Sequence, residues 1–201
     1  MCGIISYKGT QNCYPILLNG LKRLEYRGYD SAGIVSLYNN QLLQNKRLGK
    51  VQILEQEILS SIKINSNIGI AHTRWATHGK PSNENAHPHL DSLEDIAIVH
   101  NGIIENYSSI KDFLIKKGFS FNSETDTEVL VQLISYFIKN QNLEYLDAIY
   151  AALELVEGAF AVVILNKNFP EMLIGARKSS PLLLGIGKSE FFFASDASAI
   201  I

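Results

Sequence analysis

Short apolar runs lie at both ends of this chain, and longer amphipathic segments lie between them. The short runs are rich in Ile, Val and Phe and are separated by Gly, Asn or Lys, which is typical of strands. They occupy residues 3–7, 32–38, 68–71, 96–99, 159–165, 172–176, 182–186 and 191–194. Strands at both ends with helices between them predict an α+β layered fold built mainly from antiparallel sheets.

The helix predictions rest on start signals that are followed by apolar residues at helical spacing. Residues 14–24 begin with Pro15 in the first turn, and a helix reaching residue 117 begins with Asn106 as its candidate N-cap. The strongest start is the sequence TDTE at 125–128, a capping box that precedes an apolar face. A partner helix is expected at residues 143–154.

Composition excludes several classes of protein. The formal net charge of −2 gives no electrostatic basis for binding nucleic acid or an anionic membrane. The N-terminal residues lack the basic and apolar regions of a signal peptide, and no apolar run is long enough to span a membrane. The two cysteines do not indicate a disulfide framework, so we expect a reducing, cytoplasmic setting.

Cys2 is the first candidate for catalysis because it follows the initiator methionine. If Met1 is removed, Cys2 carries a thiol and a free α-amine, with unperturbed pKa values near about 8.5 and roughly 7.7–8.0. At neutral pH the amine can then act as a general base for the thiol of the same residue. The ordinary alternative is a cysteine that packs within the first strand.

His100, Asn101 and Gly102 follow the predicted strand at 96–99. An Asn-Gly pair at the end of a strand is, on its own, typical of a two-residue hairpin turn. The functional alternative is an oxyanion hole, in which the Asn101 amide and the Gly102 N–H point at a developing negative charge. Glycine at that position would let a substrate approach the backbone closely.

Arg74 and Asp126 are candidates for recognising a free amino acid, because a guanidinium can hold an α-carboxylate and a carboxylate an α-ammonium. The alternatives are a surface salt bridge for Arg74 and a first-turn acid that complements the helix dipole for Asp126. The stretch 27–33 matches no phosphate-binding loop. A structural turn explains its glycines, but its charged residues Arg27 and Asp30 fit a plain turn only if they pair.

All five histidines lie between residues 72 and 100, at His72, His78, His87, His89 and His100. Their spacing matches no helical metal-binding pattern and no zinc finger, so we expect no metal site. Residues 75–92 form the longest stretch without periodicity and contain Trp75. A loop of that length inside a compact domain is usually functional or disordered, and we favour function.

Five motifs occur here in the order in which class II glutamine amidotransferases carry them. They are MCGI at 1–4, LEYRGYDSAG at 24–33, HTRWATHG at 72–79, HNGIIEN at 100–106 and SETDTE at 123–128. The chain therefore resembles that family over its whole length, and in particular the glutaminase domain of its glucosamine-6-phosphate-forming branch. Five motifs in register are far more specific than any one of them.

The resemblance implies an N-terminal-nucleophile fold, a four-layer αββα sandwich that needs no cofactor. It implies that Cys2 attacks the side-chain amide of L-glutamine and forms a γ-glutamyl thioester, which water hydrolyses to glutamate. It also implies that Asn101 and Gly102 form the oxyanion hole.

The same resemblance implies a set of residues that bind glutamine. They are Arg74, Trp75, Thr77, His78 and Asp126. Arg74 and Asp126 would hold the α-carboxylate and the α-ammonium, while the other three would lie on a mobile loop that covers the substrate. His87 matches a position near that pocket, without an assigned chemical role.

The resemblance also sets expectations about the complete enzyme. Residues 1–201 would be the glutaminase domain without its last strands, and the sugar-isomerase domain that binds fructose 6-phosphate would lie outside this chain. In the full-length enzyme, expected to be a homo-oligomer, ammonia would convert fructose 6-phosphate to glucosamine 6-phosphate for amino-sugar biosynthesis.

Two other kinds of protein remain as alternatives. One is a catalytically inactive domain that binds glutamine or a partner and regulates, which a retained Met1 would favour because a blocked amine cannot act as a base. The other is a hydrolase or amidotransferase glutaminase with a different substrate or acceptor. The pair of Arg74 and Asp126 argues for a free amino acid as the substrate.

Overall fold

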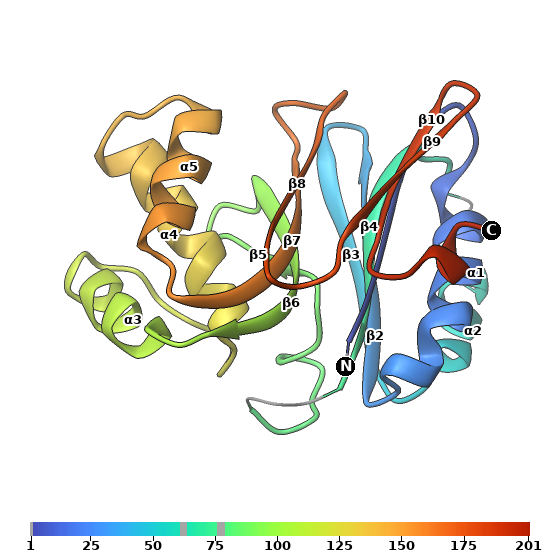
Figure 1. The fold of residues 1–201 in the computed structure, drawn as a ribbon, viewed down its shortest axis with the longest axis horizontal. Helices are drawn as coiled ribbons and strands as arrows, with labels where there is room; N and C mark the ends of the chain where they lie inside the picture. The colour runs from blue at the N-terminus through green and yellow to red at the C-terminus, as the bar shows by residue number, and fades with distance from the viewer. Residues whose placement is uncertain (1, 61–63, 76–78) are drawn as a thin grey trace.

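The computed structural model describes residues 2–60, 64–75 and 79–201. Two sheets lie face to face, and helices cover the outer face of each (Figure 1). Sheet A has six strands in the order β3-β2-β4-β1-β10-β9, and sheet B has four in the order β5-β6-β7-β8. The layers therefore run helix, sheet, sheet, helix, which confirms the expected α+β class and the four-layer αββα arrangement.

The strands of both sheets pair antiparallel, as the sequence predicted. Sheet A contains β1 Gly3–Lys8, β2 Ser31–Tyr38, β3 Gln41–Leu48, β4 Ile68–Arg74, β9 Leu183–Gly187 and β10 Glu190–Ala194. Sheet B contains β5 His89–Leu90, β6 Ile96–Ile104, β7 Gly158–Asn166 and β8 Leu173–Lys178. Every predicted strand is present, β4 and β6 extend past their predicted ends, and β3 and β5 were not predicted.

The predicted helices are all present, and one further helix joins them. On sheet A lie α1 Cys13–Leu24 and the unpredicted α2 Val51–Ser60, while η1 Glu25–Arg27 and η2 Ala197–Ala199 are short 3-10 turns. On sheet B lie α3 Tyr107–Lys116, α4 Asp126–Asn140 and α5 Tyr145–Leu155 (Figure 1). Within the described parts of the chain, no helix has the length and apolar character to cross a membrane.

Alternation along the strands builds the core. Ile4 of β1 faces sheet B and joins the apolar cluster between the two sheets, whereas its neighbour Ile5 faces α1. In β6, Ala97 and Val99 face sheet A, while Ile98 packs on the helices of sheet B. Successive strand residues point to opposite faces, so each central strand contributes to two buried layers at once.

The capping box expected at the start of α4 forms only in part. Thr125 is the N-cap, and its Oγ1 accepts a hydrogen bond from the N–H of Glu128 at 3.3 Å. The Glu128 carboxylate does not return to Thr125; it accepts from the N–H groups of Asn122 at 2.8 Å and Ser123 at 2.6 Å. The loop before α4 is thereby fixed to the first turn of the helix.

Asn106 was expected to cap α3 through its side chain, and this expected hydrogen bond does not form. Asn106 occupies the N-cap position, but its side chain makes no capping hydrogen bond. Its amide instead donates to the carbonyl of Leu155 at 2.7 Å and accepts from the N–H of Glu157 at 3.1 Å. Asn106 thus joins the end of β6 to the segment after α5.

Candidate active site

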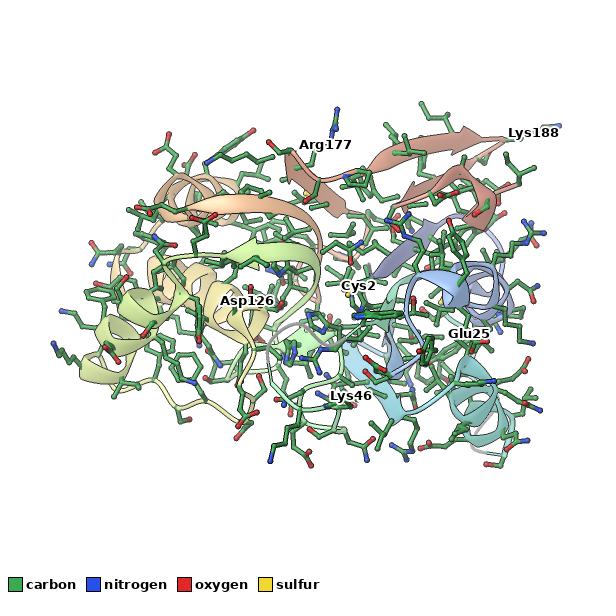
Figure 2. The ribbon with its side chains drawn as sticks, turned by 60° about the horizontal axis from the view of Figure 1, so that its bottom comes forward. Cys2, Glu25, Lys46, Asp126, Arg177 and Lys188 are labelled. Carbon is green, nitrogen blue, oxygen red and sulfur yellow. The ribbon has the colours of Figure 1, made fainter. Side chains whose placement is uncertain are left out.

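Cys2 lies just before β1, near the middle of the molecule and between its two halves (Figure 2). The antiparallel register that pairs Gly3 with Thr73 brings the end of β4 next to it. The Cys2 Sγ accepts a hydrogen bond from the N–H of Trp75 at 3.2 Å and lies 3.5 Å from the carbonyl oxygen of Trp75. The thiol is therefore fixed by backbone atoms at the end of a neighbouring strand.

Burial raises the pKa of the Cys2 thiol above its usual value, because it disfavours the charged thiolate. The backbone hydrogen bond from Trp75 and the positive charge of Arg74 act in the opposite direction. The thiol is therefore largely protonated at neutral pH, and a reaction at Sγ needs a base to take its proton.

Asn101 and Gly102 lie inside β6, paired with Ala161 and Phe160 of β7. The hairpin interpretation is therefore wrong, because the strand continues beyond Val99. Asn101 is buried, and its Nδ2 donates to the backbone carbonyl of Cys2 at 3.1 Å. This bond joins sheet B to the residue that precedes the first strand of sheet A.

Gly102 occupies a backbone conformation that side chains rarely adopt, with φ at +133°. A Cβ there would lie 2.0 Å from the carbonyl oxygen of Ala159, which belongs to the neighbouring strand. Only glycine fits both the dihedral angle and the close approach. The glycine expected at the oxyanion hole is therefore required by the strand itself.

Arg74 is the last residue of β4 and is buried, which excludes the surface salt bridge considered for it. Its guanidinium donates to the carbonyls of Gly79 at 3.4 Å and Lys80 at 3.5 Å. Burial lowers the pKa of Arg74, and the neighbouring acids, Asp30 and Asp126 among them, raise it. A guanidinium stays charged throughout the neutral range, so this is a buried positive charge.

Asp126 is the first residue of α4 and is also buried. Its Oδ2 accepts from the N–H of Ile104 at 2.9 Å, and its Oδ1 accepts from the hydroxyl of Thr127 at 3.4 Å. A carboxylate in the first turn complements the helix dipole, as expected. Asp126 additionally ties that helix to the end of β6.

One small pocket brings most of the predicted site residues together. It is lined by Cys2, Arg74, Trp75, His87, His100, Gly102, Thr125, Asp126 and Thr127. Its volume is only about 20 Å³, roughly the space of one water molecule. Larger hollows of about 480 and 520 Å³ lie elsewhere and contain none of the predicted site residues.

Trp75 forms an accessible part of the wall of that pocket. It is 44% exposed and meets Tyr29 edge to face, with ring centroids 5.4 Å apart. An amino acid enters this pocket only if part of its wall moves, and Trp75 is the exposed large side chain among its lining residues. The predicted residues Thr77 and His78 lie outside the described residues.

Four of the histidines form a buried cluster at the pocket, which His87 and His100 help to line, and threonine hydroxyls contact three of the four. Thr127 Oγ1 lies 2.7 Å from His87 Nε2 and 2.9 Å from His100 Nδ1. The Thr127 hydroxyl therefore bridges the two imidazoles. His89 Nε2 lies 3.0 Å from Thr125 Oγ1.

Burial lowers the pKa of each of these histidines, for His72 to about 3, so all four are neutral at neutral pH. The second ring nitrogens of two of them, His87 Nδ1 and His100 Nε2, have no hydrogen-bond partner among the described residues. Among the residues that the structure describes, no group of His, Cys, Asp or Glu is arranged to hold a metal ion.

Arg27 and Asp196 are site residues that the sequence did not assign. Arg27 Nε donates to the carbonyl of Cys2 at 3.1 Å, so this oxygen accepts from both Arg27 and Asn101. Asp196 lies 3.7 Å from the Arg27 guanidinium and accepts from the hydroxyl of Tyr26 at 2.9 Å. The unusual charge in the 27–33 turn was the available signal for Arg27, whereas no local signal marked Asp196.

The glycine that follows Arg27 is explained by a close approach. A Cβ on Gly28 would lie 2.7 Å from the backbone carbonyl carbon of Arg74. The expected structural turn therefore packs directly against the end of β4. This contact places Arg27 beside Cys2.

Comparison with known proteins points to one family. Residues 72–201 match the family described as "Glutamine amidotransferase domain". The whole chain is 55% identical to a protein of Bacteroides thetaiotaomicron named glutamine–fructose-6-phosphate aminotransferase (isomerizing), of which it covers 33%. A protein of the same name from Chlorobaculum tepidum is 50% identical over the whole chain, again with 33% of its length covered.

Among solved structures, one described as the allosteric regulatory enzyme of purine biosynthesis matches 99% of this chain. Its TM-score is 0.86 at 30% identity, and 43% of its own chain is covered. The chain thus spans about a third of the length of the curated relatives that it matches.

Proposed function

Because this chain belongs to the family of glutamine amidotransferase domains, we propose that it hydrolyses L-glutamine with Cys2 as the nucleophile. We further propose that the ammonia serves the formation of glucosamine 6-phosphate from fructose 6-phosphate. The relatives at 50–55% identity carry the name of that aminotransferase, and this chain covers the third of them that would release the ammonia.

The observation that carries the proposal is the meeting of Cys2 and Asn101 from opposite sheets, with Nδ2 of Asn101 3.1 Å from the Cys2 carbonyl. An amide NH₂ has two hydrogens, and one is engaged by that carbonyl. The other hydrogen and the N–H of Gly102 are the donors assigned to the oxyanion. Preorganised donors of this kind are usually the largest single contribution to acyl transfer.

The proposed reaction proceeds in two balanced steps. The Cys2 sulfur attacks the side-chain amide carbon, the C–N bond breaks, and the thiol proton leaves with the nitrogen as ammonia. Water then attacks the γ-glutamyl thioester and the C–S bond breaks. Glutamate is released, and the sulfur regains a proton as the free thiol. The α-amine of Cys2, free once Met1 is removed, is the base that accepts and returns the proton.

Arg74 and Asp126 are the proposed contacts for the α-carboxylate and the α-ammonium of glutamine. Both side chains are buried and line the same pocket as Cys2. A charge in such a place costs free energy unless an opposite charge approaches it, and a zwitterionic amino acid brings both. Trp75, Thr77 and His78 are the proposed cover over the bound substrate.

The first test compares variants of the two cysteines by two measurements. One is glutamine hydrolysis, and the other is the intact mass after treatment with a diazo-ketone analogue of glutamine. Cys2→Ala removes both hydrolysis and the covalent adduct. Cys13 is buried, and burial raises its pKa to about 12, so Cys13→Ala retains both. An adduct that persists in Cys2→Ala contradicts the assignment, and a retained Met1 without hydrolysis supports a binding or regulatory domain.

The second test separates the ammonia-releasing activity from amino-sugar formation. The purified chain is incubated with L-glutamine and fructose 6-phosphate, and glutamate and glucosamine 6-phosphate are measured separately. We expect glutamate but no amino sugar, because the chain covers only about a third of its relatives. Amino sugar made by this chain alone would overturn the proposed division of labour.

A further inference from the structure

His72 lies on β4, faces Asn101 across the gap between the sheets, and is 1% exposed. Its Nε2 is 3.0 Å from the side-chain oxygen of Asn101 and 3.0 Å from the backbone oxygen of His100. Both partners are oxygen acceptors, so Nε2 carries the proton and donates to them. The tautomer of His72 is thereby fixed by its surroundings.

The two ends of an asparagine amide have nearly the same shape but opposite hydrogen-bonding character. With Oδ1 on the His72 N–H, the Nδ2 of Asn101 points toward Cys2 and donates to its carbonyl at 3.1 Å. The opposite orientation would place Oδ1 against that carbonyl oxygen and at the site proposed for the oxyanion. It would also turn the NH₂ group toward the His72 N–H, so two pairs of like groups would meet.

We infer that His72 is a positioning residue, whose Nε2–H selects the amide orientation of Asn101 that presents NH₂ to the reacting centre. The catalytic consequence of this inference rests on the proposed function, whereas the hydrogen bond between His72 and Asn101 does not. Unlike His87 and His100, His72 does not line the pocket that holds Cys2. It acts through Asn101.

Two features hold the His72 ring in place. It stacks on His87 with ring centroids 4.3 Å apart and planes 22° from parallel. His87 is in turn bonded to Thr127 at 2.7 Å, beside the first residue of α4. The unprotonated Nδ1 of His72 has no hydrogen-bond partner among the described residues, which agrees with a neutral ring whose single proton is on Nε2.

The kinetic experiment is a double-mutant cycle between His72 and Asn101, measured as glutamine hydrolysis. His72→Phe keeps an aromatic ring for stacking but removes the N–H. We expect kcat to fall about 10- to 100-fold, a loss no larger than that of one oxyanion donor, while KM changes by less than about threefold. In the Asn101→Ala background the same change should lower kcat by less than about threefold, because no amide is left to orient. An equal loss in both backgrounds overturns the inference and leaves a packing role.

His72→Gln is the matched variant, since its amide can again donate to Asn101 Oδ1. We expect it to recover part of the kcat lost in His72→Phe, and no recovery in a folded protein counts against positioning. A readout independent of activity is the ¹⁵N spectrum of the imidazoles. It should show His72 with a protonated Nε2 and an unprotonated Nδ1 at pH 7, and the reverse tautomer overturns the inference.

The two proposals fail in different ways. If hydrolysis survives in Cys2→Ala, the proposed function is wrong. The ¹⁵N spectrum of His72 still tests whether its Nε2–H is placed to orient the amide of Asn101. If Cys2 is the nucleophile but the cycle is additive, only the role of His72 is wrong.

Discussion

At the scale of single residues, the proposed nucleophile Cys2 and the positioning residue His72 are both uncharged in the resting protein. Burial raises the pKa of the Cys2 thiol and lowers the pKa of His72, so neither is ionised at neutral pH. A neutral nucleophile avoids the cost of a buried anion before substrate arrives. Its proton must then be removed during the reaction, which is the task proposed for the α-amine.

Asn101→Ala tests the oxyanion donor directly. We expect kcat for glutamine hydrolysis to fall about 10²- to 10³-fold, because one donor to the developing charge is lost. The KM should change much less, since the proposed contacts for the α-groups belong to Arg74 and Asp126. A rise in KM with unchanged kcat would instead make Asn101 a substrate-binding residue.

At the scale of elements, the central strands explain why two pairs of candidate residues share a site. His72 and Arg74 are two residues apart on β4 and therefore point to the same face. Asn101 and Gly102 are adjacent on β6, and each is proposed to donate to the oxyanion in a different way, one through its side chain and the other through its backbone. A strand holds such groups at fixed spacing more rigidly than a hairpin turn would.

Gly102→Ala tests whether β6 tolerates a side chain at this point. A Cβ would lie 2.0 Å from the Ala159 oxygen, so we expect the free energy of unfolding to fall by more than about 3 kcal/mol, measured by urea denaturation. The control is Gly118→Ala, at φ +90° with nothing within 4 Å of the added Cβ. It should cost only about 1 kcal/mol. Equal losses would show that the dihedral angle, and not the contact with β7, requires glycine.

The elements also show which parts of the fold can be read from sequence. The strands with continuous apolar character were predictable, because burial on both faces leaves a clear pattern. The missed β3 is an edge strand with a polar sequence, QLLQNKRL, which suits its half-exposed position. The start of the missed α2 depends on a distant residue, since its first N–H, on Val51, donates to the carboxylate of Glu25, 26 positions away.

The same limit applies to the candidate site. Cys2, Asn101, Arg74 and Asp126 each became candidates through their own position or chemistry, but only the resemblance to a family joined them into one site, because no local pattern does. The bond between Asn101 and Cys2 spans 99 positions, so it depends on how the two sheets pack. Asp196 was missed for the same reason, since its partner Arg27 lies near the other end of the chain.

At the scale of the whole molecule, four buried neutral histidines make the fold sensitive to acid. Their folded-state pKa values are lowered by burial, whereas in the unfolded chain they lie near about 6.5. Below that pH the unfolded state binds more protons than the folded state, so the free energy of unfolding falls as pH falls. The loss continues toward the lowered values, which for His72 is about 3.

We expect the free energy of unfolding to be flat between about pH 7 and 8 and to fall by about 1.4 kcal/mol per pH unit for each buried neutral histidine below about pH 6.5. Urea unfolding at pH 7.5, 6.5, 5.5 and 4.5 measures this. His89→Gln removes one such group and should make the acid slope shallower by about 1.4 kcal/mol per pH unit. Undiminished stability down to pH 4.5 would show that the cluster is protonated in the folded protein.

The carbonyl of Cys2 receives hydrogen bonds from Arg27, on the side of sheet A, and from Asn101 in sheet B, both at 3.1 Å. Its position therefore reports the spacing between the two layers. That spacing is set by the apolar side chains packed between them, such as Ile4, Val99 and Val163. A substitution that enlarges one of these side chains would move the layers apart, and we expect it to alter the rate of the proposed glutamine hydrolysis through the two bonds to the Cys2 carbonyl.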